Sequence, residues 1–187
     1  MNRKEKTKME KFKTKELALI AIFAAAWIGY TFLSNMSIGQ IARGIDVHVV
    51  RSVLLVLIVA MTGRFGAATW MTTIVGIFYL SSRTPYPPVI ITFATIASGL
   101  VYDVYAKVTG YMNTTNWKVY PIGILLAGLA QSVATMGTLT VLNFFPARAI
   151  EAAWIAGLTK NVTASVVAIF ICVAIVKRVV PVYKNYS

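Results

Sequence analysis

A run of 17 residues without a charged side chain, from Leu17 to Leu33, limits what this chain can fold into more than any other feature. At a rise of about 1.5 Å per residue, a helix of this length is just long enough to enter a bilayer. Similar apolar runs follow along the chain, so that 58% of its 187 residues are hydrophobic and 13% are charged. A soluble globule of this size could not bury so much apolar surface. The sequence therefore predicts an all-α, polytopic membrane protein.

Polar and proline-rich breaks divide the chain into six apolar runs, which predict six transmembrane helices. The clearest break is Ser81–Pro88, because its three prolines cannot lie inside a helix. Asp103 and Lys107 near the end of the fourth run are spaced as an i,i+4 ion pair at a helix end. The predicted spans are 17–33, 47–62, 65–80, 89–106, 119–145 and 152–176. The expected organisation is a basic tail (1–16), a six-helix membrane domain (17–176) and a second basic tail (177–187).

The distribution of lysine and arginine predicts the orientation, because cytoplasmic segments are enriched in both. With six spans the two termini share one side, and that side holds 13 of the 18 basic residues. The other side and the span ends nearest to it hold Arg43, Arg51, Arg83, Arg148 and Lys160. We therefore expect a multi-pass protein of the cell membrane with both termini in the cytoplasm.

The polar side chains that suit ligand binding gather on the predicted outer side. Lys160 lies about 12 Å inside the sixth span if that helix starts near Ala152. An ammonium group at this depth costs roughly 2.5 kcal/mol or more unless it faces a cavity or a partner, which favours a functional role. The alternative is that Lys160 extends its four-carbon stem to the interface. Asn161 follows directly and shares a face with Trp154, and it could bind a ligand or bridge two helices.

These residues predict a site for a small solute with an anionic group. Outward-facing basic residues favour a carboxylate or a phosphate, and aromatic residues among them could stack on a ring. Gln131, Ser132 and Thr135 are interpreted instead as interhelical contacts. The candidate ligand-binding residues are Arg43, His48, Arg51, Tyr79, Arg83, Tyr86, Arg148, Trp154, Lys160 and Asn161.

Other chemistries have no visible basis in the sequence. His48 is the single histidine and has no cysteine nearby, which disfavours a metal site. A nucleophile–base pair and an HExxH motif are lacking, so we expect no enzyme and no cofactor. The chain also has no P-loop with which to energise transport.

Small residues form a stripe along the first predicted helix. Ala21, Ala25 and Gly29 are four residues apart and therefore lie on one helix face. In lipid, such a stripe lets two backbones approach closely, which suggests helix docking. The alternative is that alanine is simply common in membrane helices.

The layout resembles that of the substrate-binding S component of an energy-coupling factor (ECF) transporter. The resemblance rests on the charged tail, on K-T-K-E-L-A-L-I-A-I-F-A-A-A in the first helix, on six short helices and on the G-R-F-G-A-A-T turn into the third span. It implies that Ala21 and Ala25, extended by Gly29, meet the coupling helices of a transmembrane T component. It also implies an outward ligand pocket and energy from two separate ATPase subunits. The family's N-x-x-K near the outer start of helix six is replaced here by adjacent Lys160 and Asn161.

The sequence thus leads to a membrane uptake subunit that binds a vitamin or vitamin precursor. Two other classes stay open. A solitary secondary transporter would need no partner, and a membrane scaffold protein would lack a pocket.

The orientation can be tested with an impermeant thiol reagent on intact cells. A cysteine in place of Arg3 should resist the reagent, because the N-terminus is expected in the cytoplasm, while one in place of Ser82 should react. The reverse labelling pattern would contradict the orientation.

Overall fold

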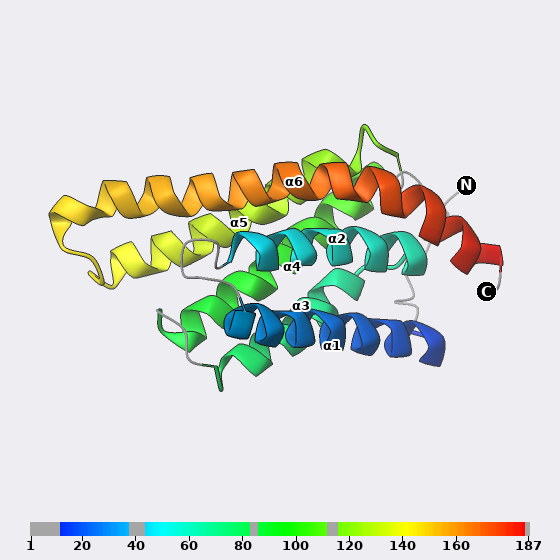
Figure 1. Cartoon of the computed structure of the whole chain (residues 1–187), viewed down its shortest axis with the longest axis horizontal. Helices are drawn as coiled ribbons and strands as arrows, with labels where there is room; N and C mark the ends of the chain where they lie inside the picture. The colour runs from blue at the N-terminus through cyan, green and yellow to red at the C-terminus, as the bar shows by residue number, and fades with distance from the viewer. Residues whose placement is uncertain (1–11, 38–43, 83–85, 112–115, 186–187) are drawn as a thin grey trace, which may run out of the picture.

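The computed structural model describes residues 12–37, 44–82, 86–111 and 116–185, and within these ranges it contains helices and no strands. Together with the apolar composition, this confirms the expected all-α, polytopic membrane fold. The elements are α1 (Thr14–Ser37), α2 (Ile45–Thr62), α3 (Ala67–Tyr79), α4 (Pro88–Thr109), α5 (Tyr120–Val141), the short 3-10 helix η2 (Ala147–Ala149) and α6 (Ile150–Asn185) (Figure 1).

The helices differ in length relative to the thickness of a bilayer. All of them except α3 and η2 are long and apolar enough to span one. The 13 residues of α3 cover only about 20 Å, less than the roughly 30 Å of a hydrocarbon core. By contrast α6 has 36 residues, about 54 Å, and continues through most of the segment that was assigned to the C-terminal tail.

The helices form a ring in the spatial order α1, α3, α4, α5, α6, α2, and α2 also contacts α3, α4 and α5 from within. This central position explains its burial: most of α2 from Arg51 to Ala60 is buried. A helix that is apolar on nearly all sides is one that other helices surround. The inner helix of the bundle is therefore α2.

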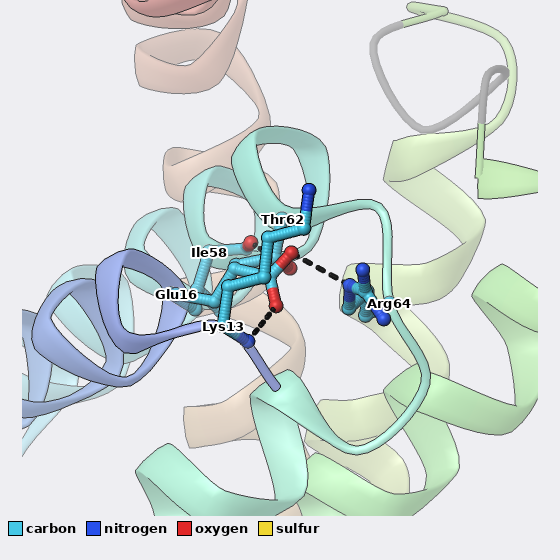
Figure 2. A network of polar contacts seen from close by, with 5 residues as sticks. All are labelled: Lys13, Glu16, Ile58, Thr62 and Arg64. Atoms are coloured by element: carbon cyan, nitrogen blue, oxygen red, sulfur yellow. Dashed lines mark hydrogen bonds and ion pairs between the residues drawn. The ribbon is translucent and has the colours of Figure 1, made fainter. Parts of the chain in front are cut away.

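The start of α1 and the end of α6 lie at the same end of the bundle, on the right of Figure 1. Lys15 Nζ lies 5.0 Å above the ring of Tyr183 there. At the same end, Glu16 joins α1 to the turn between α2 and α3 (Figure 2). Its carboxylate accepts a hydrogen bond from the Lys13 backbone N–H at 2.7 Å and forms an ion pair with Arg64 Nε at 2.6 Å. One side chain thus caps α1 and ties it to its neighbour.

The start of α3 depends on Asp103 of α4. The residue before the helix, Gly66, has no side chain to cap it, and the buried Asp103 carboxylate takes that role from the neighbouring helix. It accepts hydrogen bonds from the backbone N–H of Ala68 at 3.3 Å and of Thr69 at 2.8 Å, and from the Thr69 hydroxyl at 2.6 Å. Negative charge at a helix N-terminus is also favoured by the helix dipole.

Close approach of α3 and α4 makes this cap possible. A Cβ atom on Gly99 would lie 2.8 Å from the Ala68 carbonyl oxygen, so only glycine fits. The expected Asp103–Lys107 pair is therefore wrong: Asp103 faces α3, and Lys107 Nζ lies 5.1 Å above the ring of Phe65.

Replacement of Asp103 should destabilise the bundle. Asp103→Ala leaves the first turn of α3 without acceptors and should cost about 1–3 kcal/mol, lowering the Tm in detergent. Asp103→Asn keeps one acceptor oxygen and should cost less. Glu151→Ala removes an exposed acidic residue and is the control. A wild-type Tm for Asp103→Ala would contradict the capping role.

Candidate binding cavity

A cavity of about 290 Å³ lies where the first turns of α2 and α4 meet the second half of α5 and the first half of α6. Its volume is close to the lower end of the range for small-molecule sites, roughly 300–1,000 Å³. The lining residues are His48, Tyr86, Ile91, Gln131, Ser132, Thr135, Met136, Ala153, Ala156, Gly157, Lys160 and Asn161.

The cavity lies in the half of the bundle opposite the ends where α1 begins and α6 finishes. The starts of α2, α4 and α6 and the end of α5 all lie in this half, on the left of Figure 1. The basic-residue count assigns these same ends to the outer side. With that orientation, the cavity would face the exterior.

Arg51 of α2 lies behind the polar wall of the cavity and contacts two of its residues, His48 and Asn161. Its side chain is fully buried. Its Nη1 atom lies 3.1 Å from His48 Nδ1 and donates to Asn161 Oδ1 at 3.3 Å. Among the described residues, Nε and Nη2 of Arg51 have no hydrogen-bond partner. The guanidinium charge is thus buried beside the cavity, and no carboxylate of the described residues forms an ion pair with it.

Asn161 extends this network across to α5. Its Nδ2 atom donates to Ser132 Oγ at 2.7 Å and to the Gly157 carbonyl at 3.3 Å, while Ser132 donates to the same carbonyl at 3.1 Å. These bonds hold α5 against α6 and complete the back wall of the cavity. The expectation that Ser132 bridges helices is therefore confirmed, but Gln131, Ser132 and Thr135 also line the cavity, which the sequence analysis missed.

The Lys160 side chain lies against the start of α2. A Cβ atom on Gly44 would fall 2.1 Å from Lys160 Nζ, so a glycine leaves room for the ammonium group. Gly44 also has φ +99°, which a residue with a side chain rarely adopts. Lys160 makes no ion pair among the described residues, although Asp46, which accepts hydrogen bonds from Ser34, Tyr30 and the Gly44 N–H, lies close enough to attract its charge.

One lining residue of the cavity, Tyr86, belongs to a cluster of aromatic side chains. The ring of Tyr86 lies edge-on to Phe144 and Phe145 in the α5–α6 connection, with centroid distances of 6.1 and 6.3 Å. Trp154 donates from its indole nitrogen to the Thr140 hydroxyl at 3.0 Å and packs beside Met136, a lining residue. Tyr86 therefore adds aromatic surface to a cavity whose polar wall is built by α2 and α6.

The structure brings together five of the predicted site residues: His48, Tyr86, Lys160 and Asn161 line the cavity, and Arg51 lies behind it. Tyr79 is buried between α3 and α1, where its hydroxyl lies 3.4 Å from Thr31 Oγ1. Arg148 is exposed on η2, so it does not point inward with Lys160. Arg43 and Arg83 lie outside the described residues.

The small stripe of α1 faces away from the rest of the bundle. Ala21, Ala25 and Gly29 are exposed, and a Cβ atom on Gly29 would meet nothing within 4 Å. The opposite face carries Ile20, Ala24 and Trp27, which are buried. Among the described residues, the stripe is therefore not part of the packing between helices.

Comparisons with protein-family models, with curated proteins and with solved structures give no match. Fold and composition define the class: an all-helical membrane protein that crosses the bilayer several times. Within that class, the distinguishing feature is a cavity with cationic and hydrogen-bonding side chains on one wall.

Proposed function

We propose that this chain is the substrate-binding subunit of an ECF-type ABC importer in the cell membrane. On this proposal it captures a small micronutrient, a vitamin or vitamin precursor with an anionic group, from outside the cell. The observation that carries the proposal is the cavity containing the ammonium group of Lys160 at the predicted outer half of the bundle.

The charge around the cavity supports an anionic ligand. Lys160 and Arg51 are both partly or fully removed from solvent, and keeping such charges in a membrane protein is costly unless they have a counter-charge. Asp46, the carboxylate near Lys160, is occupied by three hydrogen-bond donors. A carboxylate or phosphate on the ligand would bring a negative charge into direct contact with the Lys160 ammonium group.

Partner subunits enter the proposal through α1. A helix face of small residues that is not packed in the bundle suits direct contact with another membrane helix. The resemblance assigns this contact to a transmembrane T component, and it assigns ATP hydrolysis to two further subunits. This agrees with the lack of a P-loop in the sequence.

Mass spectrometry of small molecules retained by the purified protein is the direct test of the proposed function. A retained organic acid or phosphate compound is the expected result. A protein that retains none, and binds none from a panel of vitamins and precursors, would contradict a substrate-binding role. Uptake by proteoliposomes that contain this chain alone would instead favour a solitary secondary transporter.

Lys160→Ala should weaken binding of the retained compound by about 1.5–3 kcal/mol, roughly 10- to 150-fold in Kd, because a charge-assisted hydrogen bond is lost. Isothermal titration measures the change. The control is Lys118→Ala, an exposed cation at the opposite end of the bundle. Arg64 is less suitable, because it forms the ion pair with Glu16. Equal affinities for wild type and Lys160→Ala would mean that the lysine does not touch the ligand.

Ala25→Trp should abolish transport and assembly with the coupling subunits while ligand binding by the isolated chain survives. A large side chain at the centre of the stripe would separate the two helices and remove their dispersion contacts. Co-purification with the ATPase subunits and binding of the retained compound are the two measurements.

The matched control is Ala26→Trp, which adds the same side chain at an exposed position about 100° around the helix. Phe23 is a poor control because it packs against the core. Loss of ligand binding in Ala25→Trp would show that the stripe acts within this chain. No effect on either measurement would mean that the stripe faces lipid.

A further inference from the structure

The hydrogen bonds of Arg51 determine which atoms the cavity can offer to a ligand. A guanidinium group only donates hydrogen bonds and does not lose its proton in proteins. The His48 atom that faces Arg51, Nδ1, must therefore be the acceptor, at 3.1 Å. In a neutral imidazole the proton then lies on Nε2. His48 can thus offer the cavity only a donor, its Nε2–H group.

The same reasoning fixes Asn161. Its Oδ1 atom accepts from Arg51, and its Nδ2 atom faces the Gly157 carbonyl, which only accepts. Ser132 accepts from Asn161 and uses its own proton on the Gly157 carbonyl. Each acceptor atom of this network, on Asn161, Ser132 and Gly157, therefore already accepts at least one hydrogen bond inside the wall. The groups that remain for a ligand on the α2–α6 side are the Nε2–H of His48 and the ammonium of Lys160.

We propose that Arg51 is a positioning residue that makes the α2–α6 wall of the cavity predominantly hydrogen-bond donating, so that it selects a soluble small molecule with an anionic oxygen head group. This inference rests on the proposed function and specifies the ligand class for the same cavity. Two lining residues on α5, Gln131 and Thr135, can donate or accept, and the remaining surface is apolar or aromatic. The ligand is then a compact molecule with one carboxylate or phosphate on a neutral body. A cation of the same size would meet the Lys160 ammonium group and the His48 donor at the polar wall.

The single histidine makes the proton position measurable. The full chain, purified with a histidine-free tag and labelled with ¹⁵N-histidine, is reconstituted in phosphatidylcholine nanodiscs and observed by NMR. We expect a protonated Nε2 and a bare, hydrogen-bonded Nδ1. In Arg51→Met, the Nδ1 resonance should move to the position of a free acceptor nitrogen. In Asn161→Ala, which keeps Arg51 and His48, it should stay. A proton on Nδ1 in the wild type overturns the proposal, whether or not the variants fold.

Ligand selection is tested in the same sample with benzoate and benzylammonium, which share a ring and carry opposite charges. Benzoate should shift the His48 Nε2–H signal in a saturable way. The apparent Kd from this titration should be at least about tenfold higher in Lys160→Ala, which corresponds to a loss of 1.4 kcal/mol or more in binding free energy. Benzylammonium should have no effect. An equal or larger response to benzylammonium overturns the ligand class.

Two further outcomes distinguish a failure of this inference from a failure of the proposed function. If phosphatidylglycerol in the nanodisc produces the benzoate shift and benzoate then adds nothing, the anion is a lipid headgroup and the inference of a soluble ligand is wrong. If neither compound shifts the signal, the anionic head group is wrong. The proposed uptake function would still be tested by identifying the small molecules that the protein retains.

Discussion

Burial of the Arg51 guanidinium is the constraint on which the cavity half of this structure depends. Removing such a charge from water costs several kcal/mol, and a well-packed apolar residue in its place is often neutral or stabilising. Arg51 is nevertheless fully buried in the central helix, and two of its nitrogen atoms lack partners among the described residues. Its contacts join α2 to α6, and Asn161 joins α6 to α5. Arg51 is therefore better explained by the cavity that it shapes than by stability.

The two halves of the bundle use polar groups differently. At the end where α1 begins, Asp103 and Glu16 are satisfied within the chain, by the first turn of α3 and by Lys13 and Arg64. At the other end, Arg51 and Lys160 make no ion pair among the described residues, and Asp46 is the carboxylate that lies near Lys160. Unpaired charge in a membrane protein is costly. We therefore expect the end of the bundle that carries such charge to bind a ligand or a partner.

Periodicity and charge predicted much of the fold, because they are local properties of the sequence. The six helices lie close to the predicted spans, and Lys160 lines a cavity as its cost inside the membrane suggested. Contacts between distant segments could not be predicted this way. Asp103 was assigned to Lys107, four residues away, but it caps a helix that starts 36 residues earlier at Ala67. Similarly, 110 residues separate Arg51 from Asn161, so nothing near either residue indicates the other.

The position of α1 links the proposed docking stripe physically to the cavity. Its exposed face carries Ala21, Ala25 and Gly29, while Tyr30 and Ser34, further along the helix, donate to Asp46 in the first turn of α2. Asp46 also accepts from the Gly44 N–H, and Gly44 lies directly against the ammonium of Lys160. A partner that displaced the second half of α1 would therefore have to break these hydrogen bonds or move the start of α2 with it. Either change would alter the surroundings of Lys160. The chain thus has a continuous set of contacts, from an outer helix face to the cavity wall, through which partner binding could change ligand affinity.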